Sequence, residues 1–545
     1  MIDVALHRWS GIAVAYAAVY GPMIAGLVRS RANFSQYAIS PIAALPLTAV
    51  AAVGSALFGG HGAAHVLLAA GASAWLGYAG GRALAQGAAA DRVHQRGALI
   101  EERKPTSGAK KATAGRAAKE AAITLAGFEV PALDETKHFK LIGTTGTGKS
   151  TAVQEIMSQA LARGDRAVIA DPDGGYLRRF YRADRGDVIL NPFDDRSVKW
   201  DLFAEIRNPY DVEQLARSLI PDHEGADRSW RGYARTFFSA VTGQAHNAGV
   251  SDIGELYRLL VVADAAELRT LVRGTPAQPF LEEHNSRMFD SIRSVTSSAV
   301  GSLNYIAQQK SAGFSVRDWV KRQEPGVLFI PYKAGQIAAL HSTISGWMRM
   351  AIFETMDRGE TMDRGRENAR LWFVVDELDA LGQIDGLKDA LARLRKFNAC
   401  CVLGFQSLAQ VSSTYGRGDA HTIVENCANT LILRCSASEG GGTARFASQL
   451  IGEREVLRTT TSRSRRLTEV LGSVSKSQHF SIEPAVLPSQ VEQLPDLAGY
   501  LKLASDPAWA RVRLDATKTW NSVRTASALP APHERHGEFR GAERE

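Results

Sequence analysis

The pattern of hydrophobic and polar positions divides the chain into two parts. The amino-terminal part is largely uncharged, and in the longer part that follows, strand-like runs alternate with segments of helical spacing. Residues 32–81 contain no Asp, Glu, Lys or Arg. Within them, the runs 42–57 and 64–76 are largely apolar and, with their small-residue flanks, long enough to cross a bilayer. The pattern therefore predicts a transmembrane hairpin of helices over about 39–58 and 63–83, whose Ala and Gly residues suit close helix packing in lipid.

A glycine-rich turn at 59–62 joins the two predicted helices. Basic residues precede the hairpin and follow it, so the positive-inside rule places both of its ends in the cytoplasm. A third uncharged run, 9–28, contains Pro22 and is predicted as an extra helix. It either spans the membrane, with the amino terminus outside, or does not span it and instead lies along the interface or packs on the hairpin. A cleaved signal peptide is not expected, because the apolar character continues far beyond any cleavage site.

The rest of the chain alternates between short apolar runs and segments with helical spacing. Apolar runs that read as buried strands occupy 139–142, 166–171, 187–190, 326–332, 371–375, 400–405 and 429–434. Helical spacing occupies 151–163, 336–357, 384–397 and 443–451. This alternation predicts an α/β fold with a parallel-rich central sheet. Between 211 and 320 the apolar residues repeat almost only at helical spacing, which predicts an all-helical insertion between strands of the sheet.

These patterns predict five parts along the chain. They are a transmembrane region over 1–84, a basic linker over 85–125, a nucleotide-binding domain over 126–210 and 321–515, the all-helical domain over 211–320 and a flexible tail over 516–545.

Composition and charge refine this division. A chain of 545 residues with 45% hydrophobic and 22% charged residues is an ordinary globular composition with room for several domains. The net charge of +7 is concentrated, since residues 82–119 carry nine Lys or Arg and three Asp or Glu. This linker either meets anionic lipid headgroups or contacts DNA. A second polar, basic segment, 454–479, either faces a DNA channel or forms a surface loop. The four cysteines lie in or beside apolar runs and are predicted to be reduced core residues.

The most informative motif is G-x-x-x-x-G-K-[ST], the phosphate-binding P-loop, which stands between a predicted strand and a predicted helix. Its glycines let backbone N–H groups turn toward phosphates, and the helix start adds partial positive charge. Lys149 is predicted to reach the β- and γ-phosphates of ATP, and the Ser150 hydroxyl to bind Mg²⁺. The predicted nucleotide-binding residues are Gly143, Thr144, Thr145, Gly146, Thr147, Gly148, Lys149, Ser150 and Thr151.

A second motif follows far downstream, where five apolar residues, 371–375, run into Asp376 and Glu377. A buried strand of this kind places Asp376 at the sheet edge beside the P-loop, where it holds the Mg²⁺ shell. Glu377 is then positioned to orient and deprotonate the attacking water. The next strand ends at Gln406, whose amide can donate to a phosphate and accept from water, so it is predicted to sense the γ-phosphate.

With these motifs in view, the chain resembles the coupling proteins of type IV secretion, the TraD/TrwB-like ATPases of conjugation. The resemblance extends over most of the chain. It rests on the phrases GTTGTGKS, DPDGGY, NPFDDRSVKWDLFAEI, VVDELDAL and LRKFNACCVLGFQS.

The resemblance implies a RecA-like, hexameric motor of the bacterial inner membrane, with the bulk of the chain in the cytoplasm. It implies recruitment of a relaxase–DNA complex and ATP-driven movement of DNA, single-stranded or double-stranded, through a type IV secretion channel. It also implies that Arg395, which the residues alone indicate only as a helix-end cation, is an arginine finger that reaches the neighbouring subunit's site. The helical insertion corresponds to the family's all-alpha domain at the cytoplasmic mouth of the ring.

Alternative functions remain at this stage. Export of protein effectors would use the same motor design, so the sequence does not separate it from DNA transfer. A chromosome pump of the cell-division type predicts more membrane spans and a carboxy-terminal winged helix, which the sequence lacks. A non-catalytic nucleotide-binding scaffold is disfavoured by Glu377, because binding alone does not require a water-activating carboxylate.

Overall fold

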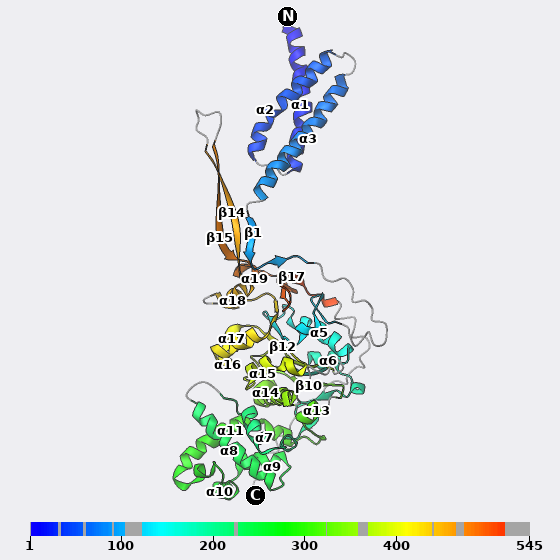
Figure 1. Ribbon diagram of the computed structural model, residues 1–545. Helices are drawn as coiled ribbons and strands as arrows, with labels where there is room; N and C mark the ends of the chain where they lie inside the picture. The colour runs from blue at the N-terminus through cyan, green and yellow to red at the C-terminus, as the bar shows by residue number, and fades with distance from the viewer. Residues whose placement is uncertain are drawn as a thin grey trace. The chain divides into compact units, whose positions relative to one another are not determined.

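The structure of the chain is a computed structural model (Figure 1). It describes residues 2–30, 34–57, 62–89, 92–103, 122–222, 227–322, 324–357, 369–438, 441–464 and 473–517. Parts of several predictions lie outside these residues, namely the turn at 59–61, linker residues 104–121, the middle of the second basic segment at 465–472 and tail residues 518–545.

Contacts divide the chain into two compact units. The first consists of Met1–Gly97 and Glu453–Glu483, and the second of Ala98–Gly452 and Pro484–Glu545. The first unit contains three helices, α1 (Ile2–Arg29), α2 (Phe34–Leu57) and α3 (Gly62–Ala89), which pack against one another.

Glycines bring α1 and α3 into close contact. A Cβ on Gly26 would lie 2.3 Å from the Ala74 carbonyl oxygen, and one on Gly77 would lie 2.4 Å from that of Met23. No larger residue fits either position. Ser73 also donates a hydrogen bond across the pair, which further fixes the helices side by side.

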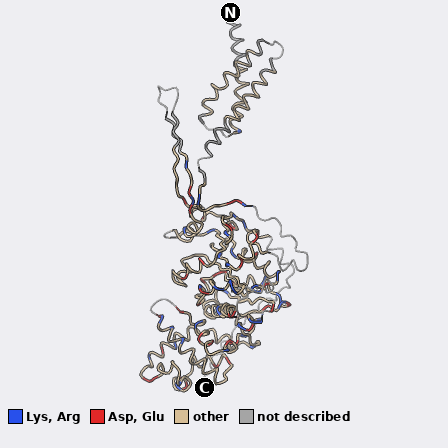
Figure 2. The backbone as a smooth tube through the Cα atoms, in the orientation of Figure 1, with Lys and Arg blue, Asp and Glu red and all other residues tan. Residues whose placement is uncertain are grey.

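The three helices lie over the amino-terminal segments predicted from the sequence, and Figure 2 shows few charged residues on the coloured parts of these helices. Over the described residues, however, no helix has both the length and the apolar character needed to cross a membrane. This finding corrects the predicted transmembrane hairpin over 39–58 and 63–83. The helices form, but they are rich in Ala and Gly, which are only weakly apolar, and α2 also contains Pro41 and Pro46.

The first unit also contains a three-stranded sheet that the sequence did not predict. Its order is β1 (Arg92–Gly97), β14 (Glu453–Ser464) and β15 (Ser473–Pro484), with β1 antiparallel to β14. The second basic segment is thus largely extended strand. Its sequence lacks the apolar alternation that normally marks a strand, since residues 458–464 are all Arg, Ser or Thr.

A ten-stranded mixed sheet forms the centre of the second unit, which confirms the predicted parallel-rich α/β fold. Its order is β2 (Ile100–Glu101), β17 (Trp509–Arg513), β16 (Ala498–Lys502), β13 (Asn429–Ile432), β5 (Phe139–Ile142), β12 (Ala399–Phe405), β11 (Leu371–Val375), β6 (Arg166–Pro172), β10 (Val327–Tyr332) and β7 (Val188–Ile189). Strands from β13 to β7 are parallel. The antiparallel strands β16 and β17 extend the sheet beyond β13.

Side chains of the central strands enter two cores, one on each face of the sheet. On β11, Phe373 belongs to one core and Trp372 to the other. Cys400 and Cys401 on β12 divide in the same way, and all four cysteines are buried and free, as predicted. Because both faces are covered, β5, β10, β11, β12 and β13 are buried throughout. Accordingly, β10, β11 and β12 are continuous apolar runs rather than alternating ones.

Helices cover both faces of this sheet. One core takes in α5 (Lys149–Ala162) and α6 (Gly175–Phe180). The other takes in α13 (Val316–Arg322), α14 (Ala334–Asp357), α15 (Leu387–Leu394), α16 (Leu408–Tyr415), α17 (Arg417–Asn426), α18 (Gly442–Ile451) and α19 (Pro488–Glu492). Smaller elements are α4 (Ala132–Glu135), the hairpin of β3 (Thr124–Leu125) and β4 (Phe128–Glu129), and the parallel pair of β8 (Lys199–Trp200) and β9 (Gly313–Phe314).

The segment predicted as a helical insertion is helical over most of its length. Its helices are α7 (Pro209–Leu219), α8 (Arg228–Asn247), α9 (Ile253–Tyr257), α10 (Ala265–Leu271), α11 (Ser286–Val300) and α12 (Ser302–Ala307). Their apolar faces continue the core that contains α14, and α7 packs directly on α14.

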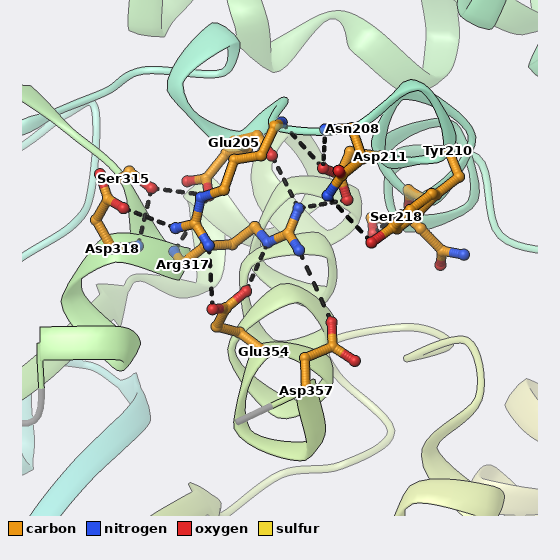
Figure 3. Close-up of polar contacts among 12 residues, drawn as sticks. Glu205, Asn208, Tyr210, Asp211, Ser218, Ser315, Arg317, Asp318, Glu354 and Asp357 are labelled. Atoms are coloured by element: carbon orange, nitrogen blue, oxygen red, sulfur yellow. Dashed lines mark hydrogen bonds and ion pairs between the residues drawn. The ribbon is translucent and has the colours of Figure 1, made fainter. Parts of the chain in front are cut away.

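A cluster of charged residues joins α7, α13 and α14 (Figure 3). Arg317 on α13 lies 2.6 Å from Asp211 on α7 and 2.8 Å from Glu354 on α14. Arg207, just before α7, lies 3.1 Å from Glu354. The Glu205 carboxylate accepts hydrogen bonds from the backbone N–H groups of residues 316 and 317. These contacts fix the start of the helical segment to helices that pack on the sheet.

Candidate nucleotide site

The P-loop connects β5 to α5 as predicted, and its backbone requires glycine. Gly148 has φ 116° and Gly146 has φ 77°, values that L-residues rarely adopt. A Cβ on Gly143 would lie 2.8 Å from Thr147 Oγ1. The Thr144 N–H donates to the carbonyl of Arg434, two residues after β13, so the segment that follows a neighbouring strand holds the loop in place.

Lys149 is buried at the start of α5 and closes the loop on itself. Its Nζ donates to the carbonyl oxygens of Gly143, at 2.6 Å, and Thr144, at 3.2 Å. Burial lowers its pKa, whereas the carboxylates of Asp376 and Glu377 act to raise it. The ammonium group therefore lies inside the loop, where the acceptors it uses are backbone oxygens rather than a carboxylate.

Asp376 follows β11 and lies beside the P-loop, as the sequence predicted. Its Oδ2 accepts a hydrogen bond of 2.6 Å from Ser150 Oγ and another of 2.6 Å from the Tyr176 hydroxyl. Its Oδ1 is buried and has no hydrogen-bond partner among the described residues. A buried carboxylate oxygen without a donor, next to a serine hydroxyl, is the hard oxygen set that suits Mg²⁺. The geometry therefore fits the predicted metal-binding pair of Ser150 and Asp376.

Glu377 and Gln406 form a polar chain with the P-loop. Thr145 Oγ1 donates to Gln406 Oε1 over 3.0 Å, and Gln406 Nε2 donates to Glu377 Oε1 over 3.5 Å. Glu377 is half-buried, and its pKa is raised, first by burial and then by the negative charges of Asp376 and Asp379. A carboxylate with a raised pKa at the end of a strand is the kind of group that accepts a proton in catalysis.

These side chains surround a cavity of about 210 Å³. Its lining consists of Thr145, Gly146, Gly148, Lys149, Ser150, Thr151, Asp376, Glu377, Gln406 and Leu497. The other predicted loop residues Gly143, Thr144 and Thr147 do not line the cavity, and their backbone groups hydrogen-bond to Phe405, Arg434 and Leu497. The structure thus brings the predicted P-loop, metal-binding and water-activating residues together in one place.

Arg395 does not line this cavity. It is exposed and begins the short 3-10 turn Arg395–Phe397, four residues before β12 starts. The other end of β12 contacts the P-loop, where the Phe405 carbonyl accepts a hydrogen bond from the Gly143 N–H. A seven-residue strand spans roughly 20 Å. Arg395 therefore lies at the opposite edge of the sheet from the P-loop of its own chain.

Two residues of the site were not predicted from the sequence. Tyr176 comes from α6, directly after the turn that ends β6, and the position of that turn at the same sheet edge was the available signal. Leu497 has no comparable signal. Its φ is 64°, its N–H donates to the Thr147 carbonyl, and its own carbonyl accepts a hydrogen bond from the Leu514 N–H.

Comparison with known proteins relates the chain to the coupling proteins of type IV secretion. Residues 122–515 match the family model described as the type IV secretion-system coupling protein DNA-binding domain. The coupling protein TraD of Escherichia coli (strain K12) is 32% identical over 375 residues, which make up 68% of this chain and 51% of TraD. The conjugal transfer protein TraG of Escherichia coli is 23% identical over 348 residues, 57% of this chain and 52% of TraG. The chain spans about half the length of the curated relatives it matches.

Solved structures of the plasmid coupling protein TrwB are also similar. TrwB in complex with the non-hydrolysable ATP analogue ADPNP has a TM-score of 0.67 and 29% identity, covering 81% of this chain and 97% of TrwB. TrwB in complex with ADP and Mg²⁺ has a TM-score of 0.64 and 29% identity, covering 75% of this chain and 90% of TrwB.

Proposed function

Because this chain belongs to the type IV secretion-system coupling proteins, the family of TraD and TrwB, we propose that it hydrolyses ATP to drive DNA into a secretion channel during conjugation. The observation that carries the proposal is the convergence of Lys149, Ser150, Asp376, Glu377 and Gln406 on one cavity. TrwB, of similar fold, has been solved with an ATP analogue and with ADP and Mg²⁺, which supports ATP and Mg²⁺ as the ligands.

Each residue has a distinct role in the proposed reaction. Lys149 exchanges its loop carbonyls for the β- and γ-phosphates, and Ser150 and Asp376 hold Mg²⁺. When bound, Mg²⁺ would neutralise part of the negative charge on the phosphate oxygens. Glu377 accepts a proton from the attacking water as its oxygen bonds to the γ-phosphorus and the bond to ADP breaks. Gln406, already hydrogen-bonded to Thr145 and Glu377, reports whether the γ-phosphate is present.

An arginine from a second copy completes this site in the proposal. Among the described residues, Lys149 is the one cationic side chain that lines the cavity. Arg395 lies at the far edge of the sheet and is exposed, so it is available to a neighbouring subunit rather than to its own P-loop. We therefore propose a homo-oligomer, a hexamer as the family resemblance implies, in which Arg395 acts in trans.

The cargo is proposed from the family rather than from a contact in the structure. The chain carries the family's DNA-binding region, and we propose that it moves DNA delivered by a relaxase to the secretion channel. We also propose that residues 126–210 and 321–515 act as the motor domain and that 211–320 act as its all-alpha domain. Contacts to DNA in such a motor are mainly to phosphates, so binding is expected to tolerate different sequences and to weaken with salt.

The first test is ATP hydrolysis by the full chain with and without single-stranded DNA. We expect hydrolysis that DNA stimulates and that Lys149→Ala abolishes, because Lys149 contacts the transferred phosphate. Lys388→Ala is the matched control, since Lys388 forms a surface ion pair with Asp419 and should keep wild-type activity.

Other results would redirect the proposal. Hydrolysis that does not respond to DNA would favour export of protein substrates by the same motor design. Bound nucleotide without hydrolysis, in every oligomeric state, would contradict the motor and favour a nucleotide-binding scaffold.

A further inference from the structure

The hydroxyl group of Tyr176 contacts the carboxylate that is predicted to face Mg²⁺, and the proposed reaction gives it no role. Tyr176 is 2% exposed and lies on α6, two hundred residues before Asp376. Its hydroxyl donates to Asp376 Oδ2 over 2.6 Å. The contact therefore links a helix that follows β6 to the end of β11, the neighbouring strand.

The chain holds Tyr176 in place through its backbone. Asp171, fully buried near the end of β6, accepts hydrogen bonds from the N–H groups of Tyr176, at 3.0 Å, and Leu177, at 2.6 Å. Gly174, with φ 65°, allows the turn between the strand and the helix. The start of α6 is thus fixed to the edge of the sheet, and the buried tyrosine places its hydroxyl against Asp376.

The hydrogen bonds of Asp376 divide between its two oxygens. Oδ2 accepts from both Ser150 and Tyr176, whereas Oδ1 is buried without a hydrogen-bond partner among the described residues. Two donors on one oxygen hold the carboxylate in a single orientation and leave the other oxygen for a cation. Outer hydrogen bonds of this kind orient metal-binding carboxylates and tune metal affinity.

We propose that Tyr176 is a positioning residue that presents Asp376 Oδ1 to the Mg²⁺ shell of the bound nucleotide. This inference rests on the proposed ATPase function. A second buried tyrosine, Tyr332, shows that burial near this site does not by itself produce a hydrogen bond to Asp376. Tyr332 ends β10, which pairs with β6 on the side opposite to β11, and its buried hydroxyl has no hydrogen-bond partner among the described residues.

The test is a binding measurement without turnover on the full chain. Binding of a fluorescent, non-hydrolysable ATP analogue is titrated with Mg²⁺ for wild type and for Tyr176→Phe, which removes only the hydroxyl. We expect the variant to need about tenfold more Mg²⁺ for half-maximal tightening of nucleotide binding. Binding in the presence of EDTA should be the same for both proteins, because Tyr176 does not line the nucleotide cavity.

The matched control is Tyr500→Phe, a buried tyrosine of β16 in the same sheet, which should keep the wild-type Mg²⁺ dependence. Equal Mg²⁺ dependence in wild type and Tyr176→Phe would overturn the positioning role and leave the proposed ATPase intact. If wild-type nucleotide binding does not tighten with Mg²⁺ at all, both proposals are overturned. A loss of nucleotide binding in EDTA by Tyr176→Phe would also overturn the positioning role, since the hydroxyl would then be shaping the loop itself.

Discussion

The nucleotide site and the ion cluster around Arg317 both remove charged groups from water, but they satisfy those groups differently. In the cluster, the Arg317 guanidinium lies between the carboxylates of Asp211 and Glu354 (Figure 3). In the nucleotide site, Lys149 donates to backbone oxygens, and Asp376 keeps one buried oxygen without a donor.

The pKa directions express the same difference. Burial acts to raise the pKa of Asp211, but hydrogen bonds from Arg317 and the backbone outweigh it and lower the pKa. For Glu377, burial raises the pKa, and the neighbouring Asp376 raises it further. A cluster that holds helices together is complete within the chain, whereas a site that binds ligands leaves charges for those ligands to satisfy.

The largest effect is expected from Glu377→Gln. The amide fills the same space but cannot accept the water proton, so hydrolysis should fall at least a hundredfold. Binding of the ATP analogue should persist, because Lys149 and the loop are untouched. The test is to measure steady-state ATP hydrolysis and binding of the ATP analogue on the same variant. Glu425→Gln is the control, since Glu425 is an exposed glutamate of α17. Hydrolysis close to wild type would mean that another group activates the water.

Breaking the ion cluster should affect stability rather than chemistry. Arg317→Met keeps the aliphatic stem but leaves the buried Asp211 carboxylate without its cation, whereas Glu354 keeps its contact with Arg207. The loss of the Asp211 ion pair should cost about 3–5 kcal/mol. Unfolding in urea measures this cost.

Arg258→Met is the matched control for that change. Arg258 also pairs with two carboxylates, Glu255 and Glu267, but all three side chains are well exposed. The urea concentration at the unfolding midpoint of Arg258→Met should therefore stay at the wild-type value. Equal losses in both variants would contradict the difference drawn between buried and exposed clusters.

A pH-dependent effect is expected at His138, directly before β5. Its Nε2 lies 2.9 Å from the Leu391 carbonyl oxygen, and its Nδ1 accepts from the Cys401 N–H, so the ring is held neutral. Burial lowers its pKa to about 4, against a usual value near 6.5. The unfolded chain therefore binds a proton between about pH 6.5 and 4 that the folded chain does not, and the stability from this group is lost as pH falls through that window.

His138→Asn tests this dependence. Asparagine tolerates the φ of 59° at this position and does not titrate. At pH 7 the wild type should have the larger free energy of unfolding. Urea unfolding should show that this difference from the variant becomes smaller by about 3 kcal/mol when the pH falls from 7 to 4. A gap that stays constant with pH would show that the ring does not titrate differently in the folded state.

The sequence predicted the parts of the site that follow from strand order. A buried apolar run that ends in Asp376 and Glu377, and another that ends at the P-loop, place their polar residues at one edge when the strands are parallel. Gln406 follows from the same rule, because β12 lies between those two strands. Hydrophobic periodicity and motif spacing are enough to show which polar residues end a strand at this edge of the sheet. No knowledge of side-chain contacts is needed for that prediction.

The remaining features depend on contacts between distant segments. The turn after β6 places Tyr176 at the correct sheet edge, but no local pattern shows that its hydroxyl contacts Asp376. No local pattern shows the approach of Leu497 to the P-loop either. The strands β14 and β15 were missed because polar residues predominate in their sequences. The amino-terminal helices lie where the sequence predicted them. Among the described residues, however, no helix is both long enough and apolar enough to cross a membrane, contrary to the prediction.

The most direct test of the central claim, that the site is incomplete within one chain, is to mix two inactive variants. Lys149→Ala lacks a working P-loop, and Arg395→Ala lacks the proposed finger. In a mixed oligomer the intact P-loop of one meets the intact Arg395 of the other, so DNA-stimulated hydrolysis should partly return. Arg393→Ala, an exposed neighbour on α15, should be active alone. A mixture that stays inactive, although the two variants co-assemble, would contradict a site shared between subunits.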